Sequence, residues 1–251
     1  MKTKLVLLVV VLLIVSMIPA LAMAKGQAKP EKTGRFVLDR SKPALPQTGL
    51  SAKPGAPAAP VSSAPAALGI KPNAVQALLN ESFEGPWPTG DWAVYDFSAA
   101  GAQWGAEAFQ PRRGQHSAWV AGDGVNGSDP NIYPYYLDWM DTWMDYPLDL
   151  TNATKATVRF QFKNDAEYGY DAFAWCASAD GGGNFYCTYH SGSTNNTWRL
   201  VNMDLKNVPG YGSMLGASDV IVTWGFMSDG SIVDRGAIVD VVRIRATGPN
   251  N

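Results

Sequence analysis

Apolar and polar residues alternate along short stretches of residues 80–247, and this period of two constrains the fold most. Residues 156–162 show it clearly, with alanine, valine and two phenylalanines at every second position and polar residues between them. Successive side chains of a strand point to opposite faces, so the pattern predicts a strand with one buried face. It recurs at 220–226 and 238–244. No stretch after residue 80 has the 3.6-residue period of a long helix, which argues against helical and α/β folds.

Clusters of glycine, proline, asparagine and aspartate separate these stretches and favour turns. Further strands are predicted at Glu81–Glu84, Trp92–Phe97, Gln103–Phe109, Ser117–Ala121, Asp171–Ser178, Phe185–His190 and Trp198–Leu205. Many short strands without helices predict an all-β fold, an antiparallel β-sandwich of the jelly-roll kind, over residues 80–247. Residues 248–251 are left as a tail.

The first 24 residues have the features of an export signal. Lys2 and Lys4 precede an apolar run from Leu5 to Ile18, and Ala22-Met23-Ala24 is typical of a signal-peptidase site. We expect cleavage after Ala24 and a secreted, extracellular protein that has no membrane contact afterwards. The alternative is an uncleaved anchor, because the apolar run is nearly long enough to span a bilayer.

Residues 25–79 have a different composition, with 8 prolines, 11 alanines and Phe36 as the single aromatic residue. The stretch lacks the apolar period of a packed element, so we expect an extended, mobile linker. Phe36–Leu38 could be a short docking segment, but nothing nearby in the sequence supports this. All tryptophans and tyrosines follow residue 80, which places the hydrophobic core there.

The sign of the net charge also changes near residue 80. Residues 1–79 carry 10 basic and 2 acidic side chains, whereas residues 80–251 carry 10 basic and 20 acidic ones. This acidic folded part argues against nucleic acid as a partner, because phosphate binding requires a basic face. It is compatible with cations such as calcium.

Two cysteines frame a predicted hairpin. A turn centred on Gly181-Gly182 places Cys176 directly opposite Cys187, because both lie equally far from the turn. In an oxidising compartment this register favours a disulfide between them. Two separate core thiols are the alternative. A zinc site that adds His190 is disfavoured, since Cys187 and His190 point to opposite faces of a strand.

Catalytic motifs of hydrolases, metalloproteases, and phosphate- or dinucleotide-binding enzymes do not occur in the sequence. His116 precedes Ser117, but neighbouring residues of a strand point apart and do not form a base–nucleophile pair. The carboxylates are plentiful but stand in no recognisable catalytic context. We therefore expect a protein without enzymatic activity.

Aromatic residues gather in a predicted loop over residues 131–146. Tyrosines and tryptophans alternate there with Asp138, Asp141 and Asp145, and the candidate ligand-binding residues are Tyr133, Tyr135, Tyr136, Trp139 and Trp143. Aromatic faces stack on sugar rings while carboxylates accept hydrogen bonds from sugar hydroxyls, so we expect this loop to bind carbohydrate or another surface polymer. The alternative is that the rings close one end of the core.

Five segments, taken together and in order, resemble a jelly-roll accessory module of secreted bacterial proteins. They are Ser82–Gly85, Arg112–Trp119, Trp143–Phe162, Asp171–Tyr186 and Trp224–Ile244. The module is similar to MAM-like and galactose-binding-like domains that are appended to subtilisin-like and immune inhibitor A-type peptidases. The resemblance covers residues 80–247 and implies the non-catalytic module without its peptidase.

The resemblance also implies a structural calcium ion, which related jelly rolls hold with a Glu of the first strand and an Asp of the last. Glu84 and Asp240 occupy those places. Asp240 also shares a predicted strand face with Ile238 and Val242, where a carboxylate requires a cation or hydrogen-bond partners. The alternative is that Asp240 accepts backbone N–H bonds or pairs with an arginine.

Taken together, these features predict a secreted, non-catalytic module that binds carbohydrate or another extracellular polymer. A structural or adhesion protein that acts through protein contacts is the main alternative. An unrecognised secreted hydrolase is the least favoured one, because carboxylates alone do not make a glycosidase site.

Overall fold

The computed structural model describes residues 28–40, 70–72, 74–98 and 100–249. Within these ranges the chain forms twelve strands and no helix, so the all-β prediction is confirmed. No helix long and apolar enough to cross a membrane occurs in this part of the chain. In chain order the strands are β1 (Glu31–Asp39), β2 (Val75–Glu81), β3 (Ala93–Asp96), β4 (Gln103–Glu107), β5 (Ser117–Asp123), β6 (Asp141–Leu148), β7 (Lys155–Asp165), β8 (Ala172–Ser178), β9 (Asn184–Gly192), β10 (Arg199–Asp204), β11 (Val220–Met227) and β12 (Gly236–Thr247).

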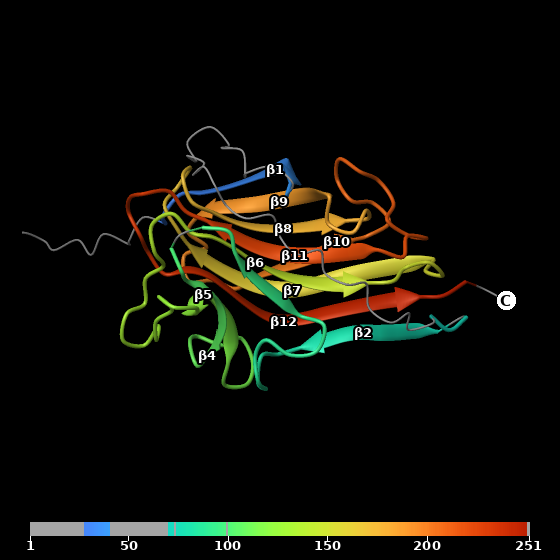
Figure 1. The fold of residues 1–251 in the computed structure, drawn as a ribbon, viewed down its shortest axis with the longest axis horizontal. Coiled ribbons are helices and arrows are strands. Elements are labelled where there is room, and N and C mark those ends of the chain that lie inside the picture. The colour runs from blue at the N-terminus through green and yellow to red at the C-terminus, as the bar shows by residue number, and fades with distance from the viewer. Residues whose placement is uncertain (1–27, 41–69, 73, 99, 250–251) are drawn as a thin grey trace, which may run out of the picture.

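The strands form two antiparallel sheets, and most of them run along the long axis of the molecule (Figure 1). Sheet A has the order β1-β9-β8-β11-β6-β3, and sheet B has the order β10-β7-β12-β5-β4, with β2 also paired to β12. Strands adjacent in space are mostly distant in the chain, as crossing between two sheets requires. The predicted antiparallel jelly-roll sandwich is therefore confirmed.

The main core lies between the two sheets. On β7 the alternate residues Val158, Phe160 and Phe162 are buried, as the sequence pattern predicts. They meet Phe173 and Trp224 from sheet A, and the ring centroids of Phe160 and Trp224 are 5.6 Å apart. Inward-facing residues of both sheets thus form one cluster.

A smaller apolar cluster covers the opposite, outer face of sheet A. It consists of Leu38, Trp143, Ala174, Cys176, Phe185, Cys187 and Ile221. The ring of Trp143 lies directly on Gly225, where an added Cβ would come within 2.2 Å of it. Because side chains cover both faces of the central strand β11, nearly all of its residues are buried rather than every second one.

Strand β1 corrects the prediction of a linker over residues 25–79. Its nine residues pair with β9, from Glu31 opposite Gly192 to Asp39 opposite Asn184. Phe36 and Leu38 face the outer cluster of sheet A, which provides the apolar contact that the strand needs. Strand β2 also begins inside the predicted linker. The export signal and residues 41–69 lie outside the described residues.

Strand β6 corrects the prediction of one loop over residues 131–146. It pairs with β11 on one side and β3 on the other, so the loop ends at Asp141. Two aspartates and a proline interrupt its apolar pattern. Asp145 is tolerated in the sheet because Arg40 neutralises its charge.

The β8–β9 hairpin confirms the predicted register and the disulfide. Cys176 and Cys187 face each other with their Cα atoms 4.1 Å apart, and their sulfur atoms are bonded. Both thiols are therefore consumed, which leaves none of the pair for a zinc site with His190. His190 is buried instead, with Nε2 3.1 Å from Glu31 and Nδ1 3.3 Å from the Asn164 amide.

Candidate functional site

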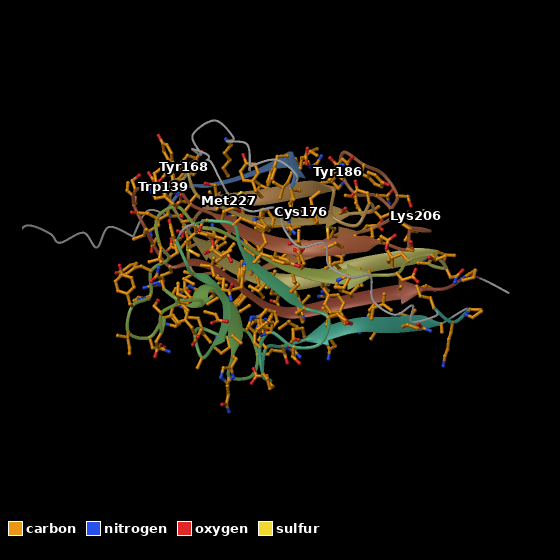
Figure 2. The ribbon with its side chains drawn as sticks, in the orientation of Figure 1. Trp139, Tyr168, Cys176, Tyr186, Lys206 and Met227 are labelled. Atoms are coloured by element: carbon orange, nitrogen blue, oxygen red, sulfur yellow. A yellow bond between two sulfur atoms is a disulfide. The ribbon has the colours of Figure 1, made fainter. Side chains whose placement is uncertain are left out.

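One end of the sandwich gathers the connections that follow β5, β7, β9 and β11, together with the start of β1. Trp139 and Tyr168 lie at this end and Lys206 lies at the other (Figure 2). Antiparallel strands alternate in direction, so these four connections reach the same end. We call it the loop end; it carries the predicted aromatic loop.

Trp139 is presented to solvent in a fixed position. Its backbone adopts a left-handed φ of +61°, and its N–H donates a hydrogen bond to the carbonyl of Asp229 at 2.7 Å. Its ring lies against Gly230, where an added Cβ would come within 2.3 Å of the ring. The side chain is nevertheless 40% exposed. Gly230 therefore serves as the floor on which an accessible aromatic ring is held.

The other predicted aromatic residues separate into two groups. Tyr133 and Tyr135 are exposed, and their rings meet edge to face with centroids 5.3 Å apart. Tyr136 and Trp143 are buried, so the prediction that they contact a ligand is wrong. Tyr136 belongs to the main core, as the alternative proposes, whereas Trp143 belongs to the cluster on the outer face of sheet A.

Two further aromatic residues at the loop end are absent from the sequence-based prediction. Tyr168 and Tyr170 lie on the connection between β7 and β8, and both are exposed. The signal was available, because this short connection combines the two tyrosines with Glu167 and Asp171, as the longer loop does with its aspartates.

Three carboxylates also lie on connections of the loop end. Oxygen atoms of Glu167, Asp171 and Asp229 all lie within 4.8 Å of one another. Asp171 is buried; its Oδ1 accepts a hydrogen bond from the Asp229 N–H at 2.8 Å, and its Oδ2 accepts one from the Tyr136 hydroxyl. Burial raises the pKa of Asp171 to about 7, and the charges of Asp229 and Glu167 add to the increase.

A pair of adjacent carboxyl groups with a raised pKa is also what a glycosidase uses. Here the geometry gives Asp171 a structural role instead. Both of its oxygens are bonded within the protein and its side chain is inaccessible, so it does not reach a substrate. Burial also raises the pKa of Glu167, with a contribution from Asp229. The cluster connects the loops on which Trp139 and Tyr168 depend.

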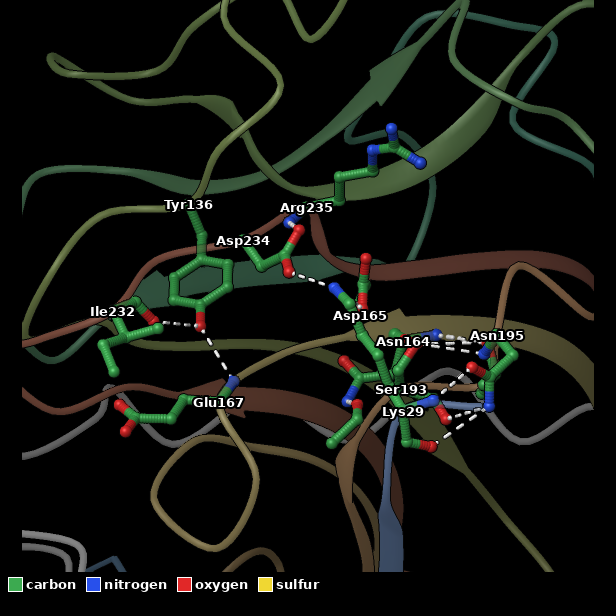
Figure 3. Close-up of polar contacts among 12 residues, drawn as sticks. Lys29, Tyr136, Asn164, Asp165, Glu167, Ser193, Asn195, Ile232, Asp234 and Arg235 are labelled. Atoms are coloured by element: carbon green, nitrogen blue, oxygen red, sulfur yellow. Dashed lines mark hydrogen bonds and ion pairs between the residues drawn. The ribbon is translucent and has the colours of Figure 1, made fainter. Parts of the chain in front are cut away.

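The start of β1 is tied to the same end (Figure 3). The Lys29 ammonium lies 3.0 Å from Asp165 and 2.6 Å from Asp234. The Lys29 N–H donates a hydrogen bond to the side chain of Asn195 at 2.7 Å. The backbone carbonyl of Asp234 in turn accepts the backbone N–H of Tyr136 at 3.0 Å. The aromatic loop and the N-terminal strand thus share one polar network.

Glu84 and Asp240, the predicted calcium ligands, lie on sheet B: Asp240 is on β12, an interior strand with partners on both sides, and Glu84 follows β2. Strand β12 pairs with β5 before Asp240 and with β2 after it, and its register shifts between Asp240 and Arg243. Val241 has a left-handed φ of +56° at this bulge. The sequence predicted Glu84 within a strand, but β2 ends at Glu81 and Glu84 lies in the loop that follows it.

Both carboxylates hold the loop between β4 and β5. Asp240 Oδ2 accepts the N–H bonds of Arg112 at 2.6 Å and Arg113 at 2.9 Å, and Glu84 Oε1 accepts those of Gln115 and the residue after it, both at 2.9 Å. Asp240 is buried and does accept backbone N–H bonds, as the alternative proposes. Burial raises the pKa of Asp240, and the nearby charge of Glu84 raises it further.

A scan against protein-family models finds no match, and a search of curated proteins finds none either. Solved structures that are similar include two adhesin domains of the Lys-gingipain of Porphyromonas gingivalis. The K1 domain is 20% identical with a TM-score of 0.46, over 68% of this chain and 98% of that one. The K3 domain is 17% identical with a TM-score of 0.47, over 67% and 98%.

A family 11 carbohydrate-binding module from Clostridium thermocellum, solved with a mixed-linked tetrasaccharide, is also similar. It is 14% identical with a TM-score of 0.42, over 70% of this chain and 97% of that one. At these identities and TM-scores the likenesses carry no argument about function. The fold class therefore rests on this chain's own strand order, and the similarity to peptidase-appended MAM-like modules stays a prediction.

Proposed function

We propose that this protein is a secreted, non-catalytic module that binds carbohydrate at the loop end of the sandwich. The observation that carries the proposal is Trp139, an exposed ring held on Gly230, which directly follows Asp229 of the acidic cluster; Glu167 of that cluster is partly exposed, whereas Asp171 is buried. The face of a sugar ring stacks on such an aromatic surface, and its hydroxyl groups donate hydrogen bonds to nearby carboxylates.

The exposed tyrosines enlarge this surface. Tyr133 and Tyr135 come from the connection before β6, and Tyr168 and Tyr170 come from the connection before β8. Large aromatic side chains are mostly buried in a soluble domain, and a group of exposed ones commonly marks a binding surface. Several rings from two loops suit a polymer, because it offers more than one sugar to the same surface.

The full chain should bind in a screen of glycan arrays and insoluble polysaccharides. Trp139→Ala should weaken binding about tenfold or more, since losing roughly 1.4 kcal/mol of contact corresponds to that factor. Tyr211→Ala is the matched control, because Tyr211 is 46% exposed and lies on the β10–β11 connection at the opposite end. Failure of the wild type to bind any glycan, or equal losses in both variants, contradicts the proposal.

A protein partner is the second candidate. The observation in its favour is the strong exposure of Ile132 and Ile232 on loops of the same end, since branched apolar side chains suit protein contacts better than sugars. An Ile132→Ser variant separates the two candidates. It should leave glycan binding unchanged and should weaken only a protein complex.

Export is part of the same proposal. The apolar run and the small-residue site of residues 1–24 support cleavage after Ala24. N-terminal sequencing of the protein from the culture medium should therefore begin at Lys25. A protein that keeps Met1 and stays with the membrane fraction contradicts it.

A structural calcium ion at Glu84 and Asp240 completes the proposal. The support is that two neighbouring carboxylates, one of them buried, hold a single loop beside the left-handed Val241. Calcium takes six to eight oxygen ligands, so backbone carbonyl groups and water would have to complete its shell. The ion would offset both the burial and the repulsion by Glu84 that raise the pKa of Asp240.

A further inference from the structure

Strand β1 is held to the sandwich along one side only. It is the edge strand of sheet A and pairs there with β9 alone. Leu38 is its single buried residue, and five of its nine residues are exposed. An edge strand with so little buried apolar surface contributes weak local stability and opens more readily than the core.

Ion pairs at the beginning of β1 help to position the strand but add little to its stability. The carboxylate of Glu31 lies 3.1 Å from His190 Nε2 and 3.0 Å from Arg199 Nη2, and Lys29 bridges two aspartates as described above. Glu31, Arg199 and Lys29 are all substantially exposed. Exposed ion pairs of this kind stabilise a structure only slightly.

Arg40, directly after β1, enters an aromatic cage on the outer face of sheet A. Its guanidinium donates two hydrogen bonds to the buried carboxylate of Asp145, at 2.5 and 2.9 Å, and one to Thr223 Oγ1 at 3.0 Å. Its central carbon lies 4.3 to 5.9 Å from four ring centroids, those of Tyr95, Phe97, Trp143 and Phe185. A bidentate hydrogen bond to a carboxylate, surrounded by aromatic rings, is a site specific for a guanidinium group.

The edge of β9 and this cage together form a receptor for an extended segment that ends in arginine. Without an occupant, the receptor would expose nine residues of unpaired strand edge and leave the buried charge of Asp145 without Arg40. Both are unfavourable, because a free strand edge leaves backbone N–H and C=O groups unpaired and a buried carboxylate without a cation is an uncompensated charge. The segment Glu31–Arg40 occupies this receptor in the structure, so it shows which ligand the receptor fits: an extended strand followed by an arginine.

The connection from this segment to the rest of the domain is long. Residues 41–69 separate Arg40 from Ile70, and they include six prolines and eight alanines. At ~3.1 Å per residue, 29 residues can reach about 90 Å when extended. That length allows the segment to reach a receptor on a neighbouring molecule.

We propose that β1 with Arg40 is an exchangeable strand, and that the receptor of one copy of this chain binds the Glu31–Arg40 segment of a second copy. Every contact made within one chain can be made between two chains, so concentration decides between the two arrangements. Reciprocal exchange gives a closed dimer, and one-way exchange gives an open chain of molecules. A tether of this kind corresponds to an effective concentration on the order of 1 mM, so exchange is expected as the protein approaches that value.

Two single-cysteine additions to the full chain test the exchange. Arg35 and Thr188 are partners across β1 and β9, so Arg35→Cys and Thr188→Cys each carry one half of a disulfide. The two variants are co-refolded together at about 1 mM, under acidic conditions that suppress thiol exchange, and then oxidised. We expect a disulfide-linked heterodimer whose bond joins positions 35 and 188 in peptide mass spectrometry.

The controls separate strand exchange from random collision. Val75→Cys replaces Arg35→Cys as a matched exposed position on β2, and it should give no heterodimer with Thr188→Cys. Adding Arg40→Ala to the Arg35→Cys chain should lower the heterodimer yield about tenfold, because the charged hydrogen bonds to Asp145 are lost.

The chain that carries both cysteines should form the bond within one molecule and thus reports that β1 and β9 pair. If that chain forms its bond while the mixture gives no more heterodimer than the Val75→Cys control, the exchange does not occur. A heterodimer yield that Arg40→Ala leaves unchanged would overturn the role of the aromatic cage.

Discussion

The hydroxyl group of Tyr136 donates a hydrogen bond to the carboxylate of Asp171, and both side chains are buried at the loop end. The Asp229 N–H bonds to the other oxygen of the same carboxylate, so three connections meet at one acid. Burial raises the pKa of Asp171 to about 7 and also raises the pKa of the Tyr136 phenol. Asp171 therefore keeps its proton in the folded protein over a pH range in which the unfolded chain is ionised.

The stability of the protein should fall as the pH rises from about 4 to about 7. In this window the folded state binds more protons than the unfolded state, so each rise in pH favours unfolding, by about 4 kcal/mol in total at most. Asp171→Asn should remove this dependence; its amide oxygen can still accept the Asp229 N–H, and its NH2 group can donate to the Tyr136 oxygen in place of the bond that Asp171 accepts. Its melting temperature should match that of the wild type near pH 4 and exceed it at pH 8; parallel pH curves would show that Asp171 does not titrate in this window.

Removal of the hairpin disulfide should destabilise the sandwich. The bond between Cys176 and Cys187 closes a short loop, and the chain-entropy model assigns about 2–3 kcal/mol to a loop of this size. The double variant Cys176→Ala/Cys187→Ala should lower the urea midpoint accordingly, without reductant in either sample. An unchanged midpoint would mean that the bond restricts the unfolded chain very little.

Gly230→Ala should weaken carbohydrate binding although residue 230 has no side chain to contact the ligand. The new Cβ would stand within 2.3 Å of the Trp139 ring, so the ring must move from its position. Gly85→Ala is the matched control, because nothing lies within 4 Å of a Cβ at that position. Affinity should fall several-fold in the first variant only, by calorimetry on a glycan found in the screen. Wild-type affinity in Gly230→Ala would argue that the floor under Trp139 is not needed.

Calcium should raise the melting temperature if Glu84 and Asp240 hold it. A ligand at a hundredfold excess over its Kd adds about 2.7 kcal/mol to the free energy of unfolding. Thermal unfolding in millimolar calcium and in EDTA measures the gain, and Asp240→Asn should abolish it. Coincident curves for the wild type would leave the two carboxylates with the loop-holding role that their N–H bonds already give them.

Local pattern was sufficient to predict much of the fold. Strands β7, β11 and β12 follow from their alternation, and the β8–β9 register follows from the glycine turn between the cysteines. Both signals are short-range, since side-chain direction and turn geometry depend on neighbouring residues. Strand β1 was not predicted, because its short amphipathic stretch stands within Pro/Ala-rich sequence. Strand β6 was not predicted, because the charge of its Asp145 is neutralised by an arginine that is distant in the chain.

The candidate site shows the same division. The sequence predicted an aromatic and acidic loop, and Trp139, Tyr133 and Tyr135 are indeed exposed on it. The burial of Tyr136 and Trp143 could not be predicted, because neither position differs locally from its exposed neighbours. Each is buried by partners far along the chain, Tyr136 beside Phe226 and Trp143 on Gly225.

By itself the sequence determined the all-β class, the hairpin disulfide and the acidic, aromatic character of the domain, because composition and alternation are local properties of the chain. Only the tertiary structure decided which rings face solvent, that Asp171 is sealed beneath Tyr136, and that Arg40 meets Asp145 from 105 residues away. The physical reason is that burial and ion pairing depend on which distant strands come together, and that information lies in no single stretch of residues.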